Sequence, residues 1–107
     1  MRYEVILFKT KTHQPVHKFI SSLQEGTIAK IIQEIDLLKE FGAGLGMPHV
    51  KKIHKYLYEL RIKSREQVRL LFCQITNKIY ILHGFKKKRQ KILTKEIEVA
   101  QKRLTDI

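Results

Sequence analysis

The chain has 107 residues, 43% of them hydrophobic, and its 22 Lys and Arg against 10 Asp and Glu give a formal net charge of +12. This length fits a single domain over residues 1–107, and the apolar content excludes a disordered chain. No apolar run approaches the length of a membrane span, and the alternating first ten residues do not resemble a secretory signal, so we expect a cytoplasmic protein. The charge favours a polyanionic partner, such as nucleic acid, the ribosome, an acidic protein or an anionic membrane surface, over a role in solubility alone.

The first half of the chain predicts one strand and two helices. Residues Arg2–Phe8 alternate and are apolar on much of both faces, which indicates a strand. Pro15 suits the first turn of a helix whose apolar stripe is Val16, Phe19, Ile20 and Leu23. A second, longer helix is predicted over Gln24–Phe41, and the glycine-rich residues 42–46 end it because glycine permits a left-handed cap.

The second half predicts three consecutive antiparallel strands and a closing helix. The strands are Leu57–Ile62, Gln67–Ile75 and Ile79–His83. A basic loop, Met47–Tyr56, precedes them, and the helix begins at about Thr94. The order β-α-α-β-β-β-α predicts a small α+β domain in which two N-terminal helices pack on an antiparallel-rich sheet, with a basic surface or cleft on the other side.

Two arginines stand out on the predicted sheet. Arg61 shares the polar face of its strand with Glu59, and it either contacts a phosphate or pairs with an acid on a solvated face. Arg69 shares a face with Leu71 and Cys73, which is an unusual setting for a charge. The single cysteine, Cys73, is expected to be a small buried residue, and one cysteine excludes an intramolecular disulfide.

A histidine and a phenylalanine follow at the end of the third strand. Alternation places His83 and Phe85 on the same face as Ile79 and Ile81. His83 is either a catalytic group or a hydrogen-bonded structural residue, and Phe85 is either a platform for an RNA base or part of the core. The basic run Lys86–Lys91 predicts contact with a phosphate backbone.

No metal site is predicted. His13 and His17 lie one helical turn apart, but neither a cysteine nor a further carboxylate cluster completes a set of ligands. We therefore expect both histidines on the surface and no metal or other cofactor.

These residue types fit one metal-free reaction. RNA is cut when a 2′-hydroxyl attacks the adjacent phosphate, which requires a proton acceptor, cations beside the phosphorane and a proton donor to the leaving 5′-oxygen. Arginine suits the phosphorane because its planar fork binds two oxygens, and lysine, histidine or tyrosine can move protons if the site shifts their pKa. Composition and spacing alone predict a basic nucleic-acid-binding or ribosome-binding domain.

Several short segments follow one another in a recognisable order. They are Gln14-Pro15-Val16, Lys51-x-Ile53, Leu57-Tyr58-Glu59-Leu60-Arg61, Arg69-Leu70-Leu71-Phe72, Ile81-Leu82-His83-Gly84-Phe85-x-Lys87-Lys88-x-x-Lys91 and Glu96-Ile97-x-x-Ala100. Over nearly the whole chain they resemble the phage-derived, HigB-like branch of the RelE/ParE toxin superfamily. The resemblance implies a RelE-like fold.

The resemblance also implies the toxin of a type II toxin–antitoxin pair, a ribosome-dependent, metal-independent endoribonuclease that cuts mRNA and inhibits translation. The implied partners are a cognate helix-turn-helix antitoxin, mRNA on the ribosome, and operator DNA through the antitoxin complex only, with no membrane. By position, the implied catalytic candidates are Arg61, Arg69 and His83. The implied RNA-binding candidates are Lys51, Lys52, Phe85, Lys87, Lys88 and Lys91. Tyr58 ranks below them because it falls on the predicted buried face.

Two other functions stay open. ParE-like members share the fold but inhibit DNA gyrase by binding it, and a catalytically inactive relative would only bind antitoxin or RNA through its basic surface. The strong positive charge, with Arg69 and His83 near strand ends, favours the ribonuclease.

Overall fold

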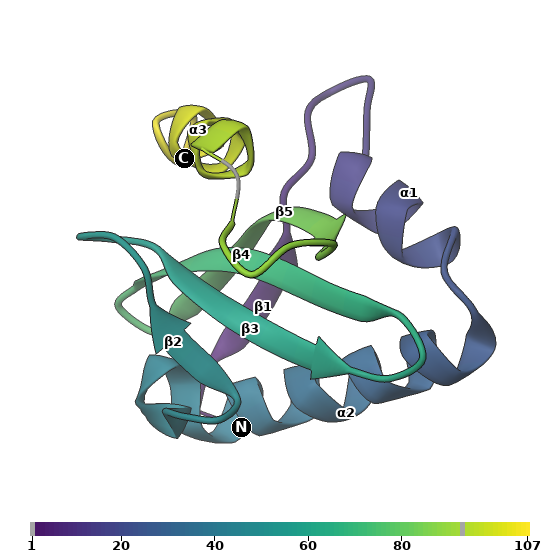
Figure 1. Cartoon of the computed structure of the whole chain (residues 1–107). Coiled ribbons are helices and arrows are strands. Elements are labelled where there is room, and N and C mark those ends of the chain that lie inside the picture. Colours follow the sequence, from purple (N-terminus) through teal and green to yellow (C-terminus); the bar gives the residue numbers. More distant parts are fainter. Residues whose placement is uncertain (1, 93) are drawn as a thin grey trace.

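The computed structural model describes residues 2–92 and 94–107, and Figure 1 shows how they are arranged. The helices are α1 (Pro15–Ser21), α2 (Glu25–Phe41) and α3 (Thr94–Leu104), with a short 3-10 helix, η1 (Gly42–Leu45), after α2. The strands are β1 (Glu4–Leu7), β2 (Val50–Lys52), β3 (Tyr58–Lys63), β4 (Gln67–Ile75) and β5 (Lys78–Lys86). The predicted α+β fold with two N-terminal helices is confirmed, with β2 as an additional strand.

The strands form one mixed sheet in the order β1-β5-β4-β3-β2. Strands β2 to β5 pair antiparallel, while β1 pairs in parallel with the first half of β5, from Lys78 to Ile81. The predicted loop over Met47–Tyr56 was wrong at Val50–Lys52, where the backbone pairs with Tyr58–Leu60 of β3. A three-residue strand that ends in two lysines has no alternation that could reveal it.

Helices cover the sheet from both sides (Figure 1). Helix α2 packs against one side through its buried Ile31 and Leu38. Helix α1 lies beside β5, where the ring of Phe19 contacts Gly84. Helix α3 lies over the opposite side, and the Nη1 of its Arg103 donates a hydrogen bond to a backbone carbonyl of β5 at 2.8 Å. The side chains between the sheet and the two N-terminal helices include the fully buried Leu60, Ile62, Leu70 and Phe72.

Gly42 ends α2 and lets the N-terminal segment pass close to it. Its φ of +60° lies in the left-handed region, and its N–H donates to the carbonyl of Leu38. A Cβ at this position would lie 2.7 Å from the ring of Tyr3. The predicted end of the second helix at the glycine-rich stretch is therefore confirmed, since an L side chain here would be both strained and blocked.

A β-bulge interrupts the alternation of β5. Leu71 of β4 pairs with His83, whereas the next residue, Phe72, pairs with Ile81. Leu82 is therefore an extra residue on β5, and side chains before and after it no longer follow one alternating series.

The bulge determines which side chains share a face with the arginines. Residues directly opposite each other in an antiparallel pair point to the same side of the sheet. Phe85 lies opposite Arg69, so Phe85 and His83 share its face, while Ile79 and Ile81 point to the other side. The predicted grouping of these four residues on one face was wrong because of the extra residue. We call the side that carries Arg61, Arg69, His83 and Phe85 the arginine face.

Three further sequence predictions concern Cys73, the two N-terminal histidines and membrane spans. Cys73 is 2% exposed, and burial raises the pKa of its thiol, as expected for a small core residue. His13 and His17 are exposed. Among the helices of the described residues, none is long and apolar enough to span a bilayer.

Candidate active site

Arg61 and Arg69 form a direct cross-strand pair of β3 and β4. Their side chains therefore leave the same side of the sheet. Like charges in this arrangement repel each other, so the pair requires an anion nearby. Without one, the two guanidinium groups would not be held together.

That anion is the carboxylate of Glu59, which is 2% exposed. Its Oε1 accepts a hydrogen bond from Arg61 Nε at 2.9 Å and lies 3.8 Å from Arg69 Nε. A buried carboxylate is tolerated only where charge pairing compensates for lost hydration. Glu59 therefore fixes both arginines, and the three groups together keep one net positive charge.

Arg69 is 5% exposed and is only partly satisfied. Its Nη1 donates to the carbonyl of Val68 at 3.0 Å, but its buried Nε has no hydrogen-bond partner among the residues that the structure describes. Burial lowers the pKa of the Arg69 guanidinium, although Glu59 acts in the opposite direction. The positive charge of Arg69 is therefore only partly compensated, which favours an anion close to it.

Lys87 follows β5 directly and lies close to the arginines. Its backbone N–H donates to the carbonyl of Gln67 at 2.7 Å, which fixes the start of the loop after β5. Burial lowers the pKa of the Lys87 ammonium, and Arg69 adds to this effect, as do Arg61 and Lys51. A lysine with a lowered pKa is a stronger proton donor than a solvated one, so it suits general acid–base chemistry.

Glu59, Arg61 and Lys87 line a cavity of about 350 Å³, which we call the arginine hollow. Lys51 reaches it from β2, Glu59 and Arg61 from β3, and Lys87 from the end of β5. Arg69 lines an adjoining shallow hollow instead, together with Lys87 and Lys88. The arginine hollow combines five cations with the buried Glu59, a composition suited to a phosphodiester; the cations are Lys51, Lys52, Arg61, Lys87 and Lys91.

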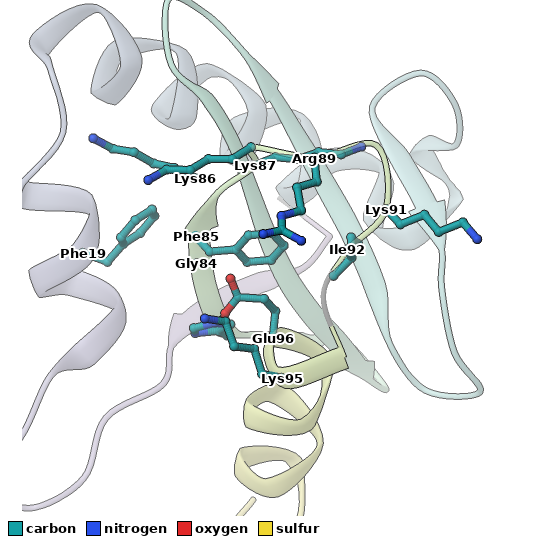
Figure 2. Close-up of a pocket in the computed structure, with 12 residues that line it drawn as sticks. Phe19, Gly84, Phe85, Lys86, Lys87, Arg89, Lys91, Ile92, Lys95 and Glu96 are labelled. Carbon is teal, nitrogen blue, oxygen red and sulfur yellow. The ribbon is translucent and has the colours of Figure 1, made fainter.

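A larger cavity of about 570 Å³ shares Lys87 with the arginine hollow, and Figure 2 shows its lining. We call it the edge pocket. Among its lining residues are Phe19 from α1, His83 and Phe85 from β5, and Glu96 from α3. His83 Nε2 lies 3.0 Å from Glu96 Oε1, and the His83 ring stacks on Phe85 with centroids 5.7 Å apart.

With this geometry established, comparison with known proteins identifies the family. A family model described as phage-derived protein Gp49-like (DUF891) matches residues 18–105. The chain belongs to the Gp49-like family. No curated protein matches it.

A solved structure extends the comparison to the fold. The Gp49-like chain matches a chain in the crystal structure of the heterotetrameric YoeB–YefM toxin–antitoxin complex from Staphylococcus aureus, with a TM-score of 0.53 and 19% sequence identity. The match covers 76% of this chain and 92% of that chain. The Gp49-like chain therefore has the RelE/YoeB-like toxin fold, as the resemblance implied.

The structure separates the predicted catalytic residues of the Gp49-like chain into two places. Arg61 and Arg69 meet at Glu59, whereas His83 lies in the edge pocket and pairs with Glu96. This pairing gives His83 the hydrogen-bonded setting that the sequence left open as an alternative. His83 is therefore not grouped with the two arginines.

The predicted RNA-binding residues differ in exposure. Lys51, Lys52, Lys88 and Lys91 are exposed, and Lys87 is half-buried. Phe85 is 8% exposed, so most of its ring belongs to the core and only a small part can contact a base. Tyr58 stacks on Phe72 with centroids 5.4 Å apart, on the side away from the arginines, in agreement with its lower rank.

Glu59 is the site residue that sequence reasoning did not select. Its spacing from Arg61 placed both on one face, and Glu59 appeared only as a pairing partner on a solvated face. That face is not open to solvent at Glu59, because the loop after β5 and helix α3 cover it. Neither covering is visible in the alternation of β3.

Proposed function

We propose that this protein is the toxin of a type II toxin–antitoxin pair and cuts mRNA on the ribosome without a metal ion. The observation that carries the proposal is the pair of arginines held by the buried Glu59, with Lys87 beside them. The toxin-like fold and the family support it.

The arginines fit the charge that develops during cleavage. When the 2′-hydroxyl oxygen attacks the phosphorus, the bond from phosphorus to the 5′-oxygen breaks, leaving a 2′,3′-cyclic phosphate and a 5′-hydroxyl. Negative charge builds on the non-bridging oxygens in the transition state. In the proposed complex, the outer nitrogens of Arg61 donate hydrogen bonds to these oxygens, and the nearby guanidinium of Arg69 adds positive charge.

Lys87 fits the second requirement, a proton for the leaving 5′-oxygen. Its lowered pKa makes the ammonium a stronger acid than that of an exposed lysine. The proton of the attacking hydroxyl leaves to a base in the arginine hollow or to water. Lys51, Lys52, Lys88 and Lys91 then hold the flanking phosphates.

The proposal includes an antitoxin protein as partner. The matched structure from Staphylococcus aureus is a toxin–antitoxin complex, which supports a comparable pairing here. A helix-turn-helix in the antitoxin, and contact with operator DNA through the complex alone, are part of the proposal and rest on the sequence resemblance.

The proposal is tested by mapping mRNA ends by primer extension in translating ribosomes, with and without the induced protein. Arg69→Ala is compared with Arg65→Ala, which removes an exposed arginine of the β3–β4 turn. We expect codon-phased cuts with the wild type and Arg65→Ala but not with Arg69→Ala. Circular dichroism establishes that each variant is folded.

The other outcomes separate the remaining functions. Intact mRNA in every sample would end the ribonuclease proposal. Growth arrest with intact mRNA would direct the work to DNA gyrase supercoiling assays. Neither arrest nor cleavage would indicate a catalytically inactive protein that only binds.

A further inference from the structure

The edge pocket exists because β5 is longer than the strand beside it. β1 pairs with β5 only as far as Ile81, and the backbone N–H of Phe8 donates the last hydrogen bond to Ile81 at 2.9 Å. Beyond the bulge, the edge of β5 faces the space between α1 and α3. Figure 2 shows Phe19 on the α1 side of this space and Glu96 with Lys95 on the α3 side.

Two aromatic rings line the edge pocket. A Cβ at Gly84 would lie 2.5 Å from the ring of Phe19, so only glycine lets this ring lie against β5. Phe85 points to the other face of β5 and contributes only a small part of its ring, because it is 8% exposed and stacks on His83. The ring of Phe19 is an apolar wall of the kind that accepts an unstacked nucleobase. The cavity volume of about 570 Å³ also suits a ligand of that size.

The rim of the edge pocket is cationic. The lining includes Lys87, Lys88, Arg89, Lys91 and Lys95. Figure 2 shows Arg89 pointing towards Phe85 from the loop after β5. Because Lys87 also lines the arginine hollow, a nucleotide held at this rim is a neighbour of the phosphate in that hollow.

One carboxylate lies among these cations, and it distinguishes between possible ligands. The Glu96 side chain is 18% exposed, and its Oε1 lies 3.0 Å from His83 Nε2. A carboxylate accepts hydrogen bonds and donates none. Guanine presents two adjacent N–H donors, N1–H and N2–H, on its Watson–Crick edge, and these match the two oxygens of a carboxylate.

We propose that the edge pocket binds an unstacked guanine of the substrate RNA next to the cleaved phosphate, with Glu96 accepting hydrogen bonds from N1–H and N2–H. This inference rests on the proposed ribonuclease function and adds a base preference to it. An acidic peptide segment would also suit the cationic rim, but its carboxylates would offer Glu96 no hydrogen-bond donors. The Watson–Crick edges of adenine, cytosine and uracil do not present two N–H donors on adjacent atoms, so each of these bases fits a carboxylate less well than guanine does.

The test compares Glu96→Gln with Glu98→Gln. Both changes remove one negative charge from α3, but Glu98 is exposed and does not line the edge pocket. The 5′ ends of cleaved mRNA are sequenced across many codons with ribosomes and each purified protein. Glutamine presents one donor and one acceptor, the pattern that pairs with adenine.

We expect wild type and Glu98→Gln to favour guanine at one fixed position from the cut. In Glu96→Gln, the ratio of guanine to adenine at that position should fall by about tenfold or more. Cleavage without a guanine preference, or with a preference that Glu96→Gln leaves unchanged, would overturn the inference while the ribonuclease function stands.

A binding measurement keeps the inference testable if no cleavage is seen. 5′-GMP, 5′-AMP, 5′-CMP and 5′-UMP are titrated into each isotope-labelled protein, and amide shifts around Gly84 and Glu96 are followed by NMR. Shifts that favour GMP in the wild type and lose this preference in Glu96→Gln support the guanine pocket without the nuclease. Equal shifts for all four nucleotides, or none, would refute it.

Discussion

The Arg61 guanidinium is held against the Glu59 carboxylate, with 2.9 Å between Nε and Oε1, on a face of the sheet that the alternation of β3 alone presents as open to solvent. The carboxylate is buried while the guanidinium keeps 19% of its side-chain surface exposed. The buried Glu59 carboxylate therefore fixes the orientation of the Arg61 guanidinium, which remains partly accessible to solvent.

Removing the negative charge of Glu59 should destabilise the fold. In Glu59→Gln, Arg61 and Arg69 lose the anion between them, and we expect the free energy of unfolding to fall by about 3 kcal/mol. Urea unfolding of this variant, beside Glu98→Gln as an exposed control, measures the loss. An unfolding midpoint equal to that of the control would show that Glu59 does not hold the arginines.

Replacing Arg69 should separate stability from activity. Arg69→Met removes a buried donor without an acceptor, so we expect the free energy of unfolding to stay the same or to rise by up to about 2 kcal/mol. Cleavage should be lost, because the variant lacks the guanidinium charge that we propose stabilises the phosphorane. Urea unfolding and mRNA mapping on the same preparation check both halves. A strongly destabilised variant would assign Arg69 a structural role instead.

The proton-donor role of Lys87 predicts a pH dependence. Its folded pKa lies below the ordinary value of 10.5. The donating form exists below the pKa of Lys87, so the cleavage rate should fall as pH rises through that value. Lys87→Arg should abolish this alkaline decline and lower the rate, because arginine retains its proton. Single-turnover cleavage from neutral pH up to the ordinary value of 10.5 compares the wild type with Lys87→Arg and with Lys18→Arg, an exposed control on α1. An identical alkaline decline in all three proteins would exclude Lys87.

The lowered pKa of Glu66 predicts that the free energy of unfolding decreases in acid. Its hydrogen bond with Lys86, and then that with the backbone N–H of Gln24, lowers the pKa of the Glu66 carboxyl from 4.5 to about 2. A lowered folded pKa stabilises the fold above pH 4.5, and this contribution is lost as pH falls towards 2. Glu66→Gln should therefore unfold with a weaker pH dependence than the wild type over this window. Urea titrations at several acidic pH values test this, and parallel curves would contradict it.

The position of the positive charge should matter more than its amount. Changing Lys88, Arg89 and Lys91 to Gln should weaken ribosome binding and reduce the slope of log affinity against log salt by roughly three. Changing Lys9, Lys11 and Lys18 to Gln removes the same charge from exposed positions that line neither the arginine hollow nor the edge pocket. Binding measured at several salt concentrations compares the two triple variants. Equal losses in both would mean that net charge alone drives binding.

The sequence predicts long periodic elements well and a single inserted residue poorly. Strand β4 is found at its predicted bounds, and α2 begins within one residue of its prediction. The bulge at Leu82 was not predicted because β5 is apolar on both sides, so no alternation marks where its series shifts. The bulge also affects the candidate site, because it places His83 and Phe85 on the arginine face.

Burial of charge was equally hidden in the sequence. The arginines were selected because their residue type suits phosphate, whereas Glu59 has the same residue type as any exposed acid of the chain. Its environment depends on a loop and a helix that come later in the sequence. The residues around Glu59 in the sequence do not reveal that segments much later in the chain will cover it.

The pairing of β1 with β5 also affects when the sheet can form during synthesis of the chain. Glu4 lies beside Lys78, so two strands that adjoin in the sheet are far apart in the sequence. During synthesis, β1 has no strand to pair with until β5 has emerged from the ribosome. Because Lys87, Lys91 and Ile97 come later still, the arginine hollow is completed late in the synthesis of the chain.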